Sequence, residues 1–190
     1  MTNKLPRANR RAQLLDHAHA IVRECGTDAL TLGELARHAG VSKPIAYSHF
    51  ETRSGLLIAL YREINERRLA AVAAVLAATS STLPDVARVV SDAYMACHAA
   101  LGPEWHAIAA AMRGDAQMLA CQQQMLDGYA DFFHAALAPV SSLPADVVRR
   151  RCIAIIGAAE ALSDAMVRER MTERIAADEL CSLILAWLTC

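Results

Sequence analysis

The 190 residues of this chain can form one domain, or a small domain joined to a larger one, and 55% of them are apolar. The net charge of −1 conceals an asymmetry, because residues 1–55 carry a balance of +3 and residues 56–190 a balance of −4, which favours nucleic-acid contact near the N-terminus. No apolar run is long enough to span a membrane and residues 1–11 lack the apolar core of a secretory signal, so both classes are excluded and we expect a cytoplasmic protein.

The first predicted helix covers residues 10–25 and follows a polar tail. One apolar stripe runs along the helix, and Gly26 ends it. Four cations lie in the tail and the first turn: Lys4, Arg7, Arg10 and Arg11. They can hold a DNA backbone through charge alone, and a merely solubilising terminus is the open alternative.

The stretch that follows predicts two short helices joined by a tight turn. Thr31 and Glu34 have the spacing of a capping box, so a helix begins at residue 32. Gly40 lies just past its end, where a left-handed residue closes a helix. Ser42 is a second N-cap, and Pro44 falls in the first turn of a helix that ends near residue 50. A helix, a glycine-containing turn and a second helix form the arrangement that reads DNA in the major groove.

The outward side of the second short helix carries groups that suit DNA recognition. Lys43 can meet a phosphate, Tyr47 and His49 offer hydrogen bonds, and Ile45 can touch a thymine methyl group. A plain helical hairpin with a solvated polar face is the alternative. The full predicted DNA-binding set is Thr31, Ser42, Lys43, Pro44, Ile45, Tyr47, His49 and Arg53.

The same stretch resembles the DNA-binding domain of the TetR (tetracycline repressor) family. The shared pattern is A-x-x-A-G-V-S, a short gap, a Tyr, an aromatic residue or His before Phe, and a basic residue at the next helix start. The residues that carry it are Ala36, Ala39, Gly40, Val41, Ser42, Tyr47, His49, Phe50 and Arg53. Thr27, Ala46 and Ser54 depart from the family pattern. The resemblance covers residues 10–57 and implies a dimeric DNA-binding protein whose remaining helices form a ligand pocket.

The rest of the chain predicts further helices and no strands. Their expected ranges are 53–78, 84–101, 104–113, 115–137, 144–170 and 172–188. The fold class is therefore all-α with about nine helices: a three-helix helix-turn-helix domain over residues 1–55 and a ligand-binding and dimerisation domain over residues 56–190. The helix over 53–78 is long enough to leave the first domain and enter the second.

Large side chains concentrate in the middle helices, where the remaining sequence is rich in alanine. They can wall a ligand pocket, and a plain filled core is the alternative for each of them. The predicted pocket residues are Tyr94, His98, Trp105, Met112, Met125, Tyr129 and Phe133.

The last two predicted helices carry apolar stripes that favour association with a second copy. The predicted dimer residues are Ile156, Leu180, Ile184 and Trp187. Two such helices from each chain would form a four-helix bundle, as the resemblance implies. An intramolecular core is the alternative.

Residues that could carry catalysis are sparse. The six cysteines have no C-x-x-C spacing, which favours small core residues over a redox or metal sensor. Cys97-His98 is the one adjacent Cys/His pair, and the Glu160/Asp164 carboxylates lie four apart with Arg168 beyond them. A salt-bridged helix face explains these carboxylates better than acid–base chemistry. We expect no catalytic residue, no metal and no cofactor.

The sequence therefore predicts a homodimeric regulator of transcription that binds a palindromic double-stranded DNA operator. We expect the protein to act as a repressor that a small apolar or amphipathic ligand releases from its operator. The residues do not define the identity of this ligand. A ligand-independent DNA-binding or architectural protein is the first alternative, and a helical enzyme that uses Glu160/Asp164 or Cys97/His98 is the second.

Overall fold

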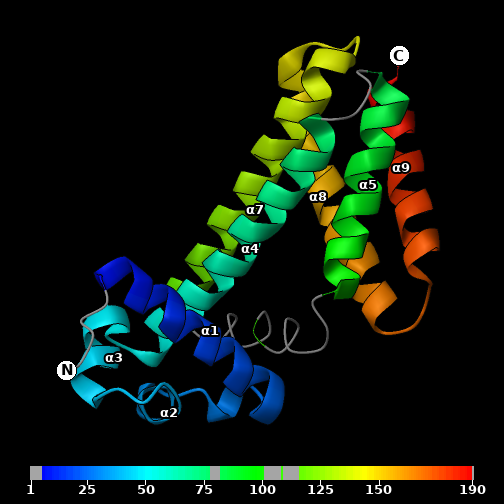
Figure 1. The fold of residues 1–190 in the computed structure, drawn as a ribbon. Coiled ribbons are helices and arrows are strands. Elements are labelled where there is room, and N and C mark those ends of the chain that lie inside the picture. Colours follow the sequence, from blue (N-terminus) through cyan, green and yellow to red (C-terminus); the bar gives the residue numbers. More distant parts are fainter. Residues whose placement is uncertain (1–5, 78–81, 101–107, 109–115, 190) are drawn as a thin grey trace. The chain divides into compact units, whose positions relative to one another are not determined.

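The computed structural model describes residues 6–77, 82–100, 108 and 116–189, and all regular structure in these ranges is helical (Figure 1). The α helices are α1 (Arg7–Cys25), α2 (Leu32–His38), α3 (Lys43–Phe50), α4 (Arg53–Ala77), α5 (Leu83–Ala100), α7 (Ala116–Leu137), α8 (Ala145–Val167) and α9 (Glu173–Leu188). Two short 3-10 helices, η1 (Thr27–Ala29) and η3 (Ala138–Val140), lie between them. The all-α prediction is confirmed. The helix expected over 104–113 lies, except for residue 108, outside the described residues.

The described residues divide into two compact units. The first holds those up to Ile64 and those between Pro103 and Cys121, and the second holds the remainder. Because α4 continues from the first unit into the second, the predicted domain boundary after residue 55 falls inside a helix and stays a proposal.

The first unit is built on the buried faces of α1, α2 and α3. Helix α1 contacts α2, and α2 contacts α3. Fully buried side chains at their junction include Leu14, Ala18, Leu30, Leu35 and Ala46. Each buried leucine contributes about 1.5–3 kcal/mol to the free energy of folding. These contacts hold α3 by one face and leave its other face outward.

Local signals set the helix ends around α2 and α3 as predicted. The Thr31 hydroxyl accepts a hydrogen bond of 3.1 Å from the Glu34 amide, so α2 begins at Leu32. Gly40 adopts a φ of 64°, which closes α2 without steric cost. At the next junction a Cβ on Gly55 would lie 2.2 Å from the Phe50 carbonyl oxygen, so the close approach of α4 to the end of α3 requires glycine there.

The second unit surrounds a core made by α5, α7, α8 and α9. Helix α5 contacts both α8 and α9, and α8 contacts α9. Its most deeply buried side chains include Val90, Met95, Phe133, Leu137, Val148 and Ile155. Helix α4 adds Leu69 and Leu76, which are partly buried against this core.

Three of the four predicted dimer residues belong to this core. Ile156 is 2% exposed, and Leu180 and Ile184 are fully buried within the single chain. The α8 and α9 stripes that carry them pack inside the unit rather than on its surface, so the intramolecular alternative describes them. Trp187 differs, because 41% of it is exposed.

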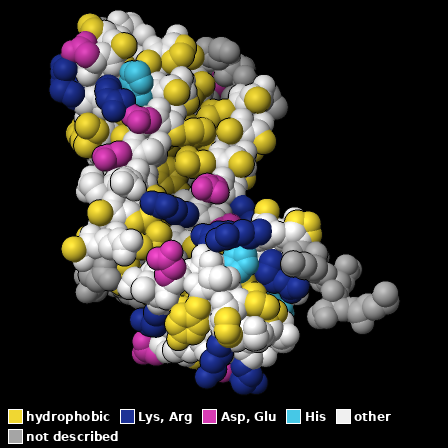
Figure 2. All heavy atoms as spheres, turned by 90° about the vertical axis from the view of Figure 1, so that its left-hand side faces the viewer, with side chains coloured by type: hydrophobic (Ala, Val, Ile, Leu, Met, Phe, Trp, Pro, Cys, Tyr) yellow, Lys and Arg dark blue, Asp and Glu magenta, His cyan; other side chains and the backbone are white. Residues whose placement is uncertain are grey.

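On the face shown in Figure 2, Lys and Arg side chains gather over the lower part, where α1, α2 and α3 lie, and hydrophobic side chains are interspersed with them. Among the helices that the structure describes, none combines the length and the apolar character needed to cross a membrane.

Candidate nucleic-acid interface and ligand site

Helix α3 presents the predicted DNA-binding side chains on its outward face. Ala46 and Phe50 anchor the opposite face in the core of the first unit. Lys43 is exposed, Ile45 is half-buried, and Tyr47 is 51% exposed. A large aromatic side chain left half in solvent beside a lysine is typical of a binding surface rather than of a core.

The predicted residues at the two helix starts lie on the same motif. Thr31 is exposed, and its hydroxyl oxygen serves as the α2 cap. Ser42 is the exposed N-cap residue of α3, but its side chain makes no capping hydrogen bond. Pro44 is exposed in the first turn of α3. The Ser42 hydroxyl therefore does not cap α3.

The C-terminal end of α3 is held by arginines from α1. Arg11 donates a hydrogen bond of 2.8 Å to the His49 carbonyl oxygen, and its guanidinium lies 4.8 Å from the Phe50 ring centroid. Arg7 donates to the Ser48 carbonyl oxygen at 3.3 Å. Positive charge is favourable at a helix C-terminus, where carbonyls lack helical partners. Arg7 and Arg11, which the sequence predicts as contacts to the DNA backbone, thus also attach α1 to α3.

The His49 ring is half-buried at this same place. Burial lowers its pKa, and the nearby positive charges of Arg7, Arg11 and Arg10 lower it further. The neutral imidazole is therefore the favoured form in the folded protein, and it keeps one donor and one acceptor nitrogen.

Arg53 has an intramolecular task that the sequence did not reveal. Its guanidinium donates to the Leu30 carbonyl oxygen at 2.9 Å and to the Thr27 carbonyl oxygen at 2.8 Å. The Asp28 carboxylate lies 3.9 Å away. Arg53 therefore braces the segment that enters α2, and its predicted DNA contact stays a prediction.

Four predicted pocket residues form a buried aromatic cluster in the second unit. The Tyr94 ring lies 4.5 Å from the His98 ring, 5.9 Å from that of Tyr129 and 6.2 Å from that of Phe133, between centroids. All four side chains are buried. The four rings therefore pack against one another inside the second unit, and their part in a ligand pocket stays a prediction.

Polar atoms at the edge of this cluster are paired. The Tyr94 hydroxyl donates to the Glu160 carboxylate at 2.7 Å, and the Tyr129 hydroxyl donates to the Asn65 side-chain oxygen at 2.7 Å. The Asn65 amide in turn donates to the half-buried Met125 sulfur at 3.3 Å. The two other predicted pocket residues, Trp105 and Met112, lie outside the described residues.

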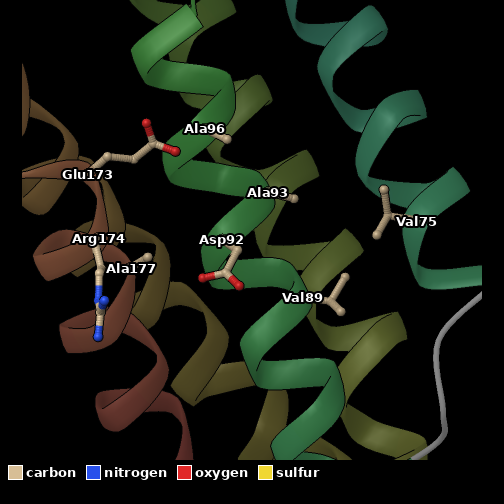
Figure 3. Close-up of a pocket in the computed structure, with 8 residues that line it drawn as sticks. All are labelled: Val75, Val89, Asp92, Ala93, Ala96, Glu173, Arg174 and Ala177. Carbon is tan, nitrogen blue, oxygen red and sulfur yellow. The ribbon is translucent and has the colours of Figure 1, made fainter.

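An open hollow of about 640 Å³ lies elsewhere on the second unit, along α5 (Figure 3). Its wall is mainly apolar and comes from three helices: Val75 on α4; Val89, Asp92, Ala93 and Ala96 on α5; and Glu173, Arg174 and Ala177 on α9. Its volume is in the range of small-molecule sites. None of the five predicted pocket residues that the structure describes is among its lining residues. Its lining comes from distant parts of the chain and combines five alanines and valines with three charged residues, so no local sequence signal marks it.

The residues considered for catalysis have structural partners. Glu160 accepts the Tyr94 hydrogen bond, and Asp164 forms an ion pair with Arg168 at 2.9 Å. Cys97 is half-buried beside buried His98. Within the described ranges no three His, Cys, Asp or Glu side chains are grouped as a metal would require.

The comparisons with known proteins identify the segment that contains α2 and α3. Residues 14–60 match the family model described as bacterial regulatory proteins of the tetR family. The N-terminal domain belongs to the tetR family. This tetR-family domain contains α2, α3 and the start of α4, which are the elements that form the candidate interface.

Curated relatives match about a third of the chain. The chain is 43% identical over 58 residues to the HTH-type transcriptional activator FasR of Mycolicibacterium smegmatis, which is 30% of this chain and 26% of FasR. It is 42% identical over 72 residues to the HTH-type transcriptional regulator BetI of Rhizobium meliloti, which is 37% of this chain and 36% of BetI. The matches thus span about a quarter to a third of these relatives, both of which are named as regulators of transcription.

Solved structures extend the likeness to the whole fold. The transcriptional regulator FadR of Bacillus subtilis, solved in complex with stearoyl-CoA, superposes with a TM-score of 0.70 at 16% identity, over 92% of this chain and 97% of that one. The helices beyond the tetR-family domain therefore share the fold of that structure, while the two sequences differ widely.

Proposed function

We propose that this protein regulates transcription by binding a palindromic double-stranded DNA operator as a homodimer. The observation that carries the proposal is the outward face of α3, where Lys43 and half-exposed Tyr47 stand opposite the buried Ala46 and Phe50. The match of residues 14–60 to the tetR family supports it. In such a complex α3 enters the major groove, Lys43 meets a phosphate, and Tyr47 with Ile45 contacts bases.

Two copies are needed to read two half-sites about 34–36 Å apart. The outer faces of α8 and α9 suit this association better than the stripes that the sequence suggested. Ile153 on α8 is 60% exposed and Trp187 on α9 is 41% exposed. Both lie at the same end of the helix pair, because the Arg151 guanidinium donates to the Trp187 carbonyl oxygen. Paired with a second copy, these side chains would be removed from water.

The proposed regulator is a repressor that a small apolar or amphipathic ligand releases from DNA. The hollow along α5 supports a ligand of this kind, because valines and alanines form its wall while Glu173 and Arg174 lie at its α9 side (Figure 3). An apolar body would cover the wall, and a polar group would reach the charged side chains. FadR of Bacillus subtilis binds stearoyl-CoA on the same fold. Since FasR is an activator, the direction of regulation is part of the proposal.

Release requires that the ligand bind the DNA-incompetent state more tightly than the DNA-bound state. A coupling of about 1–3 kcal/mol would weaken operator binding roughly 5- to 150-fold. By reciprocity, operator DNA weakens ligand binding by the same factor. The continuous α4 provides one covalent path between the DNA-reading helices and the second unit.

The test begins with selection of duplex DNA by the full chain and a thermal-shift screen for ligands. A ligand so found is titrated with and without the selected operator, and we expect its affinity to fall at least fivefold with operator present. Failure to select any palindrome would refute operator binding. Equal ligand affinity in both titrations would refute gating and favour a ligand-independent DNA-binding protein.

The hollow is tested by filling it. Ala93→Trp places an indole among the lining residues, so we expect the ligand-induced thermal shift to disappear while operator affinity is kept. Ala99→Trp is the matched control, because Ala99 is exposed on the same helix and does not line the hollow. If the ligand binds Ala93→Trp as it binds the unaltered chain, the site lies elsewhere.

A further inference from the structure

The hollow along α5 in the second unit combines an apolar wall with a charged margin (Figure 3). The apolar wall consists of Val75, Val89, Ala93, Ala96 and Ala177. Val75 is 50% exposed, and Ala96 is exposed as well, so part of this wall lies in water in the single chain. Covering the wall with an apolar group removes that surface from water, which favours binding.

The charged margin lies where α5 faces α9. Asp92 on α5 and Glu173 and Arg174 on α9 line it. In Figure 3 the Glu173 side chain extends from α9 toward α5, beside Ala96, whereas the Arg174 side chain runs along α9. Two carboxylates and one guanidinium leave the lining of the hollow with one net negative charge.

The positive side chains near this margin are already engaged by a further carboxylate. Asp178 on α9 lies 3.7 Å from the Arg174 guanidinium, and it accepts a hydrogen bond of 2.7 Å from Arg88 on α5. Arg88 also lies 3.4 Å from the Asp92 carboxylate. An anionic ligand would therefore compete with Asp178 for both guanidinium groups and would approach two carboxylates of the lining.

Glu173 is the carboxylate of the margin that remains available. Among the residues that the structure describes, it has neither a hydrogen-bond donor nor a cationic partner. It is exposed in the first turn of α9, where the positive end of the helix dipole favours a negative charge. A cation at the margin can therefore pair with Glu173 without breaking an existing ion pair.

We propose that the hollow binds a cationic amphiphile, a molecule in which an ammonium group is attached to an apolar chain or ring. The apolar part covers the wall, and the ammonium group contacts the Glu173 carboxylate and lies near Asp92. A hollow of about 640 Å³ has the size of a small-molecule site. This inference rests on the proposed function, because it names the class of ligand for the hollow that the proposed function uses.

The experiment titrates three probes into the full chain by calorimetry: decylammonium chloride, decanol and sodium decanoate. The probes share one alkyl chain and differ in the charge of the head group, and all are kept below the concentrations at which they form micelles. We expect decylammonium to bind about threefold or more tightly than decanol, and decanoate to bind most weakly. Ala93→Trp fills the hollow and should abolish the binding of all three.

Substitution of Glu173 isolates the contact with the head group. Glu173→Gln removes the charge and keeps the size, so we expect decylammonium to bind about three- to tenfold more weakly while decanol binds as before. Glu179→Gln is the matched control, because Glu179 is exposed on the same helix and does not line the hollow. It should leave all three affinities unchanged. Arg174→Gln removes the positive charge of the lining and should strengthen decylammonium binding.

Tighter binding of decanoate than of decylammonium, or an unchanged decylammonium affinity in Glu173→Gln, would overturn the cationic assignment. Decylammonium binding that Ala93→Trp leaves intact would place the site elsewhere. Absence of saturable decylammonium binding would also overturn the proposal, and a changed sedimentation of Ala93→Trp would then assign the hollow to contact with a second copy.

The proposed function is tested separately by titrating the selected operator with and without decylammonium. If decylammonium binds in the hollow and operator affinity is unchanged, the gating of the proposed regulator is refuted while the ligand class stands. If a different ligand releases the operator and decylammonium fails the tests above, the ligand class is refuted while the gating stands.

Discussion

Substitution of Arg53 tests whether its side chain stabilises the domain or contacts DNA. Its guanidinium donates to the carbonyl oxygens of Leu30 and Thr27, so Arg53→Ala leaves both acceptors without this donor. Hydrogen bonds from a charged group contribute about 1.5–3 kcal/mol each when buried. The Arg53 side chain is 42% exposed, so water replaces part of each bond, and we expect a loss of about 2 kcal/mol in the free energy of unfolding.

For a chain of this size, a loss of about 2 kcal/mol lowers Tm by roughly 4–8 °C. Lys43→Ala is the matched comparison, because Lys43 is exposed and its removal should change the unfolding free energy by less than about 0.5 kcal/mol. Thermal unfolding followed by circular dichroism measures both variants. Each is then tested for operator binding over a range of salt concentrations, well below its Tm.

The salt dependence distinguishes the two roles. Loss of one phosphate contact reduces the magnitude of the slope of log K for operator binding against log salt concentration by about 0.9 for each DNA-binding domain. We expect this decrease for Lys43→Ala and an unchanged slope for Arg53→Ala. The reasoning is refuted if Arg53→Ala has the same Tm as the unaltered chain and shows the reduced salt slope, since Arg53 would then be a phosphate contact.

Three further predictions follow from burial and charge. Ile153→Glu should give a stable monomer in sedimentation experiments, and this monomer should bind the operator poorly. Ile184→Glu should instead unfold the chain, because Ile184 is fully buried. If Ile153→Glu remains a stable dimer, the dimer interface lies elsewhere. The lowered pKa of His49 means that the unfolded state takes up a proton first, so stability is full above the ordinary value of 6.5 and is lost as pH falls through the lower folded pKa. Urea titrations from pH 7.5 to 5.0 should show this loss, and His49→Gln should reduce it; an equal loss in both proteins would assign it to other groups. Iodoacetamide at pH 8 should modify exposed Cys25 and leave Cys152 intact, since burial raises the pKa of Cys152 to about 11; equal labelling of the native chain would contradict this burial.

The sequence alone determined the DNA-reading motif, because its signals act over a few residues. Thr31 caps α2 through an amide three positions away, and Gly40 supplies the left-handed turn. Thr52 likewise accepts a hydrogen bond of 3.0 Å from the Gly55 amide at the start of α4. Each interaction closes within one helical turn, so the residue order specifies it without knowledge of the remaining chain.

Only the tertiary structure decided what lies between the helices. An apolar stripe has the same periodicity whether it faces its own chain or a second copy, so the sequence could not place Ile184 inside the second unit. Arg53 meets Leu30 from 23 positions away, and His17 meets His38 from 21 positions away. Such contacts depend on how helices pack, and packing is set by the combined shape of many side chains rather than by any local pattern.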